Sequence, residues 1–284
     1  MLTVFHTPVL QKQFDTRGYV LFPFFLTKKE VSELIGLFEK FQKEYTGFFH
    51  TTHFSTDISH KQAVHDAITV AVFPKAAPYL NDYSPLFGNF MIKNPDPLSP
   101  MDMHADWTYV DETKFNSVSI WIPLVDVSEE NGCLGIIEGS DKIANDIRGP
   151  LIRQSTRNHE KEWEKKYGRL LPMKAGDAIF YNHRLLHYSP PNKTRAARPA
   201  VNLSVAPAVA PILHYCLPEG AVEIEMYKVS EPSFFIRYNN FQRPQGEGPQ
   251  RTFSTQVVEY IDDRMANFRW HRLMSKTKNL FLYS

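Results

Sequence analysis

Two histidines and an aspartate have the side-chain types and the spacing that hold a metal ion. His104 and Asp106 are separated by one residue, and in a β-strand residues two apart point to the same side, so both can bind one ion. Far downstream, His183 and His187 lie at or near the end of a predicted strand, and either can supply a third ligand. Two imidazoles and one carboxylate on an octahedral iron leave three adjacent positions open to other ligands.

A second group of residues suits a carboxylate-bearing partner. Arg198 lies on the next predicted strand, and its planar guanidinium can pair bidentately with a carboxylate. Ser189, two residues beyond His187, can add a hydroxyl donor to the same carboxylate. The sequence therefore indicates a metal centre with an anion site beside it.

Short apolar and alternating segments predict the strands that position these side chains. We expect strands over 18–25, 88–94, 117–125, 133–137, 178–181 and 198–205. Trp121 shares one face of its strand with two serines, and Arg198 and Asn202 share one face of theirs, while apolar residues occupy the other faces. This pattern suits the wall of a ligand cavity, although a polar face in contact with solvent would produce it too.

Two helices are expected outside this strand-rich region. Thr27 and Glu30 form a capping-box pattern before apolar residues at helical spacing, which predicts a helix from about Lys28 to Glu44. A similar period predicts a C-terminal helix at about 255–276. Because strands outnumber helices between 88 and 206, we expect a single domain over 1–284, mainly β with flanking helices and built on a sandwich or barrel.

Composition limits the classes of partner. The 284 residues are 43% hydrophobic with a formal charge of +1, which gives no electrostatic case for nucleic acid or an anionic membrane as the main partner. No segment approaches the roughly 20 apolar residues that span a bilayer. Cys133 and Cys216 cannot form a disulfide framework, and the N-terminus lacks a signal-peptide pattern, so we expect a soluble cytoplasmic protein.

Two further polar segments predict no site of their own. His50, His53, His60 and His65 match no tetrahedral ligand spacing and are expected to be ordinary loop and helix-surface residues. The charged segment 141–169 is expected to be a solvated helix or excursion rather than a binding patch.

Short motifs follow one another in a defined order along the chain. They are His104-Ala105-Asp106, Asn131-Gly132-Cys133-Leu134, Gly139-Ser140, Gly176-Asp177, His187-Tyr188-Ser189, Asn192-Lys193-Thr194 and Arg198. Together with the opening segment 14–20 and its following capped helix, this set resembles the phytanoyl-CoA dioxygenase family of iron(II)/2-oxoglutarate oxygenases. The resemblance covers roughly residues 14–206 and implies a double-stranded β-helix core, the jelly roll of cupin-like proteins.

The resemblance implies a role for each candidate residue. It implies that His104, Asp106 and His187 bind iron, which selects His187 over His183 as the third ligand. It also implies that Arg198 and Ser189 clamp the distal carboxylate of 2-oxoglutarate and that Trp121 lines the cosubstrate pocket. His183 then lies beside the metal or faces the substrate, with a merely structural role as the alternative.

Two positions bear on how this chain compares with the family. Asp141 follows Gly139-Ser140 where the family usually has a histidine, and because that position is not a metal ligand the departure concerns packing or substrate fit. Asp106 is present where related halogenases have Gly or Ala to admit a halide, which favours hydroxylation over halogenation.

The expected activity is O2-dependent hydroxylation of an unactivated C–H bond in a small metabolite or natural-product intermediate, by a monomer or homodimer. Substrate is expected over Trp107-Thr108-Tyr109 and beneath segment 141–169, with His183 and Asn202 as further candidate contacts. The alternatives are a non-catalytic metal or 2-oxoglutarate sensor on the same fold and a metal-dependent cupin that does not use 2-oxoglutarate. The complete ligand set with Arg198 argues against the sensor, and the cupin would leave Arg198 and Ser189 without a role.

Overall fold

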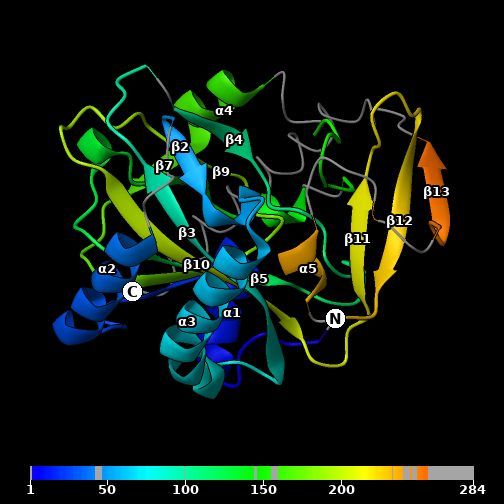
Figure 1. The fold of residues 1–284 in the computed structure, drawn as a ribbon, viewed down its shortest axis with the longest axis horizontal. Coiled ribbons are helices and arrows are strands. Elements are labelled where there is room, and N and C mark those ends of the chain that lie inside the picture. The colour runs from blue at the N-terminus through cyan, green and yellow to red at the C-terminus, as the bar shows by residue number, and fades with distance from the viewer. Residues whose placement is uncertain are drawn as a thin grey trace, which may run out of the picture.

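Strands dominate the middle of the chain, and most helices lie near its start (Figure 1). The computed structural model describes residues 2–41, 47–98, 100–143, 146–154, 159–231, 233–238, 244 and 248–254. The helices are α1 Pro8–Arg17, α2 Lys28–Phe41, α3 Ile58–Ala76, α4 Glu160–Tyr167 and α5 Phe234–Arg237, with 3-10 turns η2 Thr52–Phe54, η3 Ala77–Tyr79, η4 Glu129–Asn131 and η5 Ser140–Lys142. The strands are β1 Tyr19–Phe22, β2 Phe49–Thr51, β3 Tyr83–Lys93, β4 Met101–His104, β5 Val118–Pro123, β6 Leu134–Ile137, β7 Gly168–Leu171, β8 Ala178–Asn182, β9 His187–Ser189, β10 Arg198–Pro207, β11 Ile212–Cys216, β12 Glu223–Val229 and β13 Arg251–Ser254.

Two antiparallel sheets form the centre of the molecule. The larger sheet has the order β1-β8-β5-β10-β3-β2, and the smaller has the order β4-β9-β6-β7. A third sheet, β11-β12-β13, lies to one side of them (Figure 1). The prediction of a mainly β fold with flanking helices is confirmed.

The outer face of the larger sheet packs against helices. Ile120 of β5 and Leu203 of β10 belong to one buried apolar cluster with Leu34 of α2 and Ile68 of α3. These strand residues are the apolar half of the alternation seen in the sequence. Burial of such side chains supplies the main driving force for attaching the helices to the sheet.

The inner face of the larger sheet meets the smaller sheet. Trp121 of β5 packs in a second buried cluster with Ile136 of β6. The polar residues Arg198 and Asn202 of β10 are also buried. The polar face of β10 therefore faces the interior, as the cavity interpretation requires, and does not meet solvent.

Capping residues explain where the two longest helices begin. The Thr27 backbone N–H donates to the Glu30 carboxylate at 2.8 Å, and the Glu30 N–H donates to Thr27 Oγ1 at 3.3 Å, which confirms the predicted capping box before α2. The predicted end of this helix near Glu44 lies outside the described residues. At α3, Asp57 accepts a hydrogen bond from the His60 N–H at 2.9 Å. The prediction placed no helix over 58–76, although it allowed helix-surface histidines in this region, and α3 is therefore an addition to it.

All six predicted strands occur, with shifted ends. The strand expected at 18–25 stops at Phe22, before Pro23 and before Phe24 with its positive φ of 55°. The strand expected at 88–94 begins earlier, at Tyr83.

Segment 141–169 does contain a helix, but that helix is not wholly solvated. Trp163 and Tyr167 of α4 are buried in a cluster that includes Tyr188 of the smaller sheet. The C-terminal helix predicted at about 255–276 lies outside the described residues. In the part of the chain that the structure describes, no helix is both long and apolar enough to cross a membrane.

The contact between α3 and β3 gives a test of this packing. A Cβ atom at Gly88 would lie 2.9 Å from Cγ2 of Ile68, so Gly88→Ala should lower the free energy of unfolding by about 1–3 kcal/mol in urea denaturation. Gly36→Ala in α2 is the matched control, because its Cβ would meet nothing within 4 Å. The control should raise stability by roughly 0.5–1 kcal/mol. An equal gain at both positions would contradict the close approach of α3 to β3.

Candidate metal and carboxylate site

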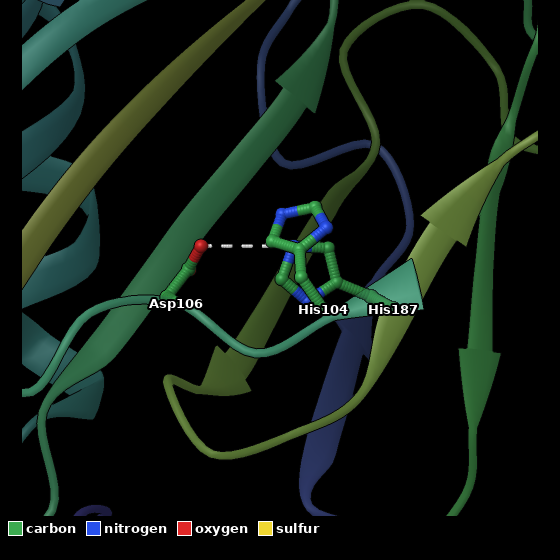
Figure 2. Close-up of side chains that lie close together, drawn as sticks. All are labelled: His104, Asp106 and His187. Atoms are coloured by element: carbon green, nitrogen blue, oxygen red, sulfur yellow. Dashed lines mark ion pairs between the residues drawn. The ribbon is translucent and has the colours of Figure 1, made fainter. Parts of the chain in front are cut away.

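The three residues expected to bind metal lie together in the structure. His104 ends β4, His187 begins β9, and the two are register partners in the smaller sheet. One ligand atom from each of His104, Asp106 and His187 lies within 4.8 Å of the others. Figure 2 shows the Asp106 carboxylate facing the two neighbouring imidazoles, with Nε2 of His187 3.6 Å from Oδ1 of Asp106.

The expectation that one strand holds both His104 and Asp106 is wrong. β4 ends at His104, and Ala105 and Asp106 lie in irregular backbone beyond it. Figure 2 shows this backbone leaving the strand as a loop that brings Asp106 opposite the histidines. The side chains therefore converge through the path of the loop rather than through strand alternation.

Hydrogen bonds fix which atoms of the triad face a metal. Nδ1 of His104 lies 2.7 Å from the Asp102 carbonyl oxygen, and Nδ1 of His187 lies 2.9 Å from the Leu185 carbonyl oxygen. A carbonyl only accepts, so each Nδ1 holds the proton and each Nε2 presents a lone pair. The Ser119 hydroxyl donates to Oδ2 of Asp106 at 2.8 Å, which orients the carboxylate.

The protonation of His187 also suits metal binding. Burial, followed by the neighbouring His104, lowers the pKa of His187 to about 4. Its imidazole is therefore neutral near pH 7, and neutral imidazole is the form that coordinates metals. Two imidazole nitrogens and one carboxylate oxygen fit iron(II).

Arg198 is a buried cation with unused hydrogen-bond donors. It is 4% exposed, and its guanidinium carbon lies 5.5 Å from the centre of the Trp121 ring. Among the described residues, none accepts a hydrogen bond from its Nε or Nη1. Burial lowers the pKa of Arg198 to about 10, which leaves it charged at neutral pH. A buried charge of this kind needs a hydrogen-bonded counter-charge, so the site fits a carboxylate ligand.

Lys93 is a second buried basic residue beside this site, and the sequence prediction missed it. It lies opposite Arg198 in the register of β3 and β10. Its ammonium donates to Oγ of Ser189 at 2.5 Å and to the carbonyls of Ser189 and Pro190. Burial, followed by the nearby Arg198, lowers the pKa of Lys93 to about 7. Lys93 thus links the predicted clamp residues Arg198 and Ser189.

One cavity of about 300 Å³ is lined by the three candidate metal ligands and by Arg198. The residues expected at the site that line it are His104, Trp107, Asp106, Tyr109, Trp121, His187, Ser189, Arg198 and Asn202. His183 is not among the lining residues. It is fully buried, and its ring meets the edge of Tyr109 with centroids 5.2 Å apart.

The histidine-rich segment contributes one unexpected residue to the cavity. His53, expected to be an ordinary surface residue, is buried, lines the cavity and stacks on Phe87 with ring centroids 4.5 Å apart. Asp141 is buried beside Gly18 and does not line the cavity. The departure from the family pattern at Asp141 therefore concerns packing.

The strand alternation of β3 contained a signal that could have revealed more of the site. Asn89 and Met91 line the cavity, while Phe90 and Ile92 between them belong to the outer apolar cluster. Lys93 lies two residues beyond Met91, so it belongs to the same face of β3 as Asn89 and Met91. Its alignment with Arg198 required the register of the two strands, which the sequence alone does not provide.

Known proteins resemble this chain in sequence. A family model described as phytanoyl-CoA dioxygenase (PhyH) matches residues 14–200. The phytanoyl-CoA dioxygenase domain-containing protein 1 homolog of Dictyostelium discoideum is 26% identical over 155 residues, which is 52% of this chain and 52% of that protein. Phytanoyl-CoA dioxygenase 1 of Oryza sativa subsp. japonica is 28% identical over 120 residues, 41% of this chain and 42% of that protein. The chain spans about half the length of these curated relatives.

Solved structures resemble the fold. The non-heme alpha ketoglutarate dependent carbocyclase SnoK from nogalamycin biosynthesis aligns with a TM-score of 0.54 at 17% identity, over 85% of this chain and 94% of that one. HygX from Streptomyces hygroscopicus, solved with nickel and 2-oxoglutarate bound, aligns with a TM-score of 0.53 at 17% identity, over 72% and 88% of the two chains. These likenesses confirm the expected jelly-roll core. Since the family model matches more than half of the sequence, the chain belongs to the phytanoyl-CoA dioxygenase family of iron(II)- and 2-oxoglutarate-dependent oxygenases.

Proposed function

We propose that this protein is an iron(II)- and 2-oxoglutarate-dependent dioxygenase that hydroxylates an unactivated C–H bond of a small metabolite or natural-product intermediate. The observation that supports it most is one cavity lined by a His-Asp-His triad and by the buried cation Arg198. A metal-dependent cupin without 2-oxoglutarate would leave the Arg198 guanidinium buried with no anionic ligand. Such uncompensated burial is costly, so Arg198 argues for a dicarboxylate cosubstrate.

Each end of the cosubstrate has its own set of residues in this proposal. His104, Asp106 and His187 would hold iron(II) through two Nε2 atoms and one carboxylate oxygen. Arg198, Lys93 and the Ser189 hydroxyl would bind the distal carboxylate of 2-oxoglutarate. Bound iron and 2-oxoglutarate supply the activation of O2 that side chains cannot perform. The chain's own contribution is to orient both ligands and to keep water from the cavity.

Substrate would occupy the part of the cavity lined by Trp107, Tyr109 and Asn202. Asn202 and Asn89 are register partners on β10 and β3, and both are buried. Within the described residues, no group donates to the Oδ1 atom of either side chain. Two buried acceptors suit a substrate that presents hydroxyl or amine donors against an aromatic wall. His183 would support Tyr109 through their ring contact and would not touch substrate.

We further propose hydroxylation rather than halogenation, because Asp106 is present and is oriented by Ser119. We also propose that the enzyme acts in the cytoplasm as a monomer or homodimer. Cys133 and Cys216 are buried and are not joined in a disulfide, which suits a reducing compartment.

Anaerobic spectroscopy followed by turnover tests the activity. Addition of iron(II) and 2-oxoglutarate should produce the weak visible charge-transfer band, and oxygen with a panel of small hydroxylated or aminated compounds should then yield succinate and hydroxylated product. A band without any succinate would instead identify a sensor. The absence of a band would contradict the proposed site.

Replacement of the carboxylate ligand should abolish both signals. Asp106→Ala removes one of three metal ligands, so we expect no hydroxylated product and a greatly weakened band. Asp102→Ala is the matched control, because the Asp102 side chain is exposed and only its carbonyl contacts His104. Full activity in Asp106→Ala would refute its assignment as a ligand.

Neutral replacements of the two cations should weaken 2-oxoglutarate binding selectively. Each loses hydrogen bonds to a charged group, worth roughly 1.5–3 kcal/mol, so Arg198→Met and Lys93→Met should each raise the KM for 2-oxoglutarate by about 10- to 100-fold. Iron(II) affinity should stay near the wild-type value. Arg195→Met, at an exposed position in the loop that precedes β10, serves as control. An unchanged dependence on 2-oxoglutarate would remove these residues from the clamp.

Asn202 should affect substrate rather than cosubstrate. Asn202→Leu removes a buried polar group and keeps a side chain of similar size, so any substrate found in the panel should bind more weakly while the affinity for 2-oxoglutarate stays constant. The fraction of succinate formed without hydroxylated product should also rise. If the variant instead bound 2-oxoglutarate more weakly, with an unchanged ratio of hydroxylated product to succinate, Asn202 would belong to the cosubstrate pocket.

A further inference from the structure

The loop that follows β4 forms no β-ladder among the described residues. β4 ends at His104, and residues 105–109 are irregular although Ala105 and Tyr109 are buried. Buried backbone N–H and C=O groups need hydrogen-bond partners. Two side chains from residues 146–154, within segment 141–169, supply such partners to Ala105 and Asp106.

Gln154 pairs with the residue between two proposed metal ligands. The Ala105 N–H donates to Oε1 of Gln154 at 2.9 Å, and Nε2 of Gln154 donates to the Ala105 carbonyl at 2.8 Å. The side-chain amide thus offers one donor and one acceptor, as a neighbouring strand would. Gln154 also lines the cavity.

Arg148 holds the same loop one residue further along. Its side chain is 1% exposed, and its Nε donates to the backbone carbonyl of Asp106 at 2.6 Å. Nη2 donates to Oε1 of Glu112 at 2.5 Å, and Nη1 donates to the Asp146 carbonyl at 2.6 Å. The Thr108 N–H donates to the Arg148 carbonyl at 3.0 Å. Each of these contacts joins Arg148 either to its own segment, 141–169, or to residues 106–112.

The burial of Arg148 indicates what this arrangement fixes. Burial of a guanidinium costs several kcal/mol unless its donors are satisfied, and the donors here end on the backbone of Asp106 and the carboxylate of Glu112. A carboxylate ligand on irregular backbone can bind metal well only if that backbone is held to a fraction of an ångström. Two contacts on consecutive residues, Ala105 and Asp106, provide this restraint.

We propose that Gln154 and Arg148 are positioning residues, which hold the loop of Asp106 in the geometry that binds metal. The inference rests on the proposed metal site. It gives segment 141–169 a role at that site, although the segment contributes no metal ligand. Outer partners of metal ligands typically change metal affinity by about 10- to 100-fold when replaced, and we expect an effect of this size.

Titration of the metal-free protein with Co(II) alone tests the inference without turnover. Gln154→Leu keeps the size of the side chain and removes both hydrogen bonds, so Co(II) should bind about 10- to 100-fold more weakly, with altered visible d–d bands. Gln154→Glu keeps the acceptor for the Ala105 N–H and loses the donor, so its affinity should be intermediate. Arg148→Lys keeps the charge beside Glu112 and should also weaken Co(II) binding.

Gln11→Leu is the matched control. Oε1 of Gln11 accepts from the backbone N–H groups of Val4 and Phe5 at 2.7 and 2.9 Å, which is the same kind of contact away from the cavity. This variant should lose stability but keep wild-type Co(II) affinity and bands. If Gln154→Leu fails to fold, Gln154→Glu and Arg148→Lys provide the comparison.

The outcomes separate two failures. Wild-type Co(II) affinity and bands in the folded Gln154 and Arg148 variants would overturn the positioning role alone. Failure of the unaltered protein to bind Co(II) would overturn the proposed metal site and, with it, this inference.

Discussion

The two-sided chemistry of β10 is the constraint on which the rest of the structure depends. Leu203 and its apolar neighbours attach the strand to the helices, while Arg198 and Asn202 face the interior between the sheets. A shift of the strand by one residue would exchange these faces and turn Arg198 toward the helix-covered side of the sheet. The register with β3 and β5 therefore fixes the core and the cavity in a single step.

The two halves of the site are held by different means. The proposed carboxylate-binding half lies on paired strands, where Lys93 and Arg198 are opposite one another. In the proposed metal-binding half, only the histidines lie on strands, and Asp106 lies on a loop held by Ser119, Gln154 and Arg148. The first half depends on sheet register and the second on individual side-chain hydrogen bonds.

Local patterns account for what the sequence could predict. The capping box at Thr27 and Glu30 and the alternation of β5 and β10 involve neighbouring residues, so the start of α2 and the buried strand faces followed from them. The helix α3 did not, because polar residues occupy its first half and Pro74 lies inside it, although Asp57 offered a cap. The strands β11 to β13 were not predicted either.

The residues of the candidate site also divide into those that local sequence motifs indicate and those that depend on tertiary contacts. The family motifs pointed to His104, Asp106, His187 and Arg198 without any knowledge of tertiary contacts. Lys93, Gln154 and Arg148 were not predicted, because their roles arise from contacts between segments that are far apart in the sequence. The supposed strand position of Asp106 was wrong for a related reason, since the side chains outside β4 determine the path of its loop.

The close approach of α3 to Gly88 has a mechanical consequence for the cavity. Ile68 of α3 packs directly on β3, the strand that carries Asn89 and Lys93. The wall of the cavity formed by β3 is therefore backed by a helix and cannot move outward. We therefore expect the β3 side of the cavity to keep its shape whichever ligand is bound, as a fixed template for the molecules that enter.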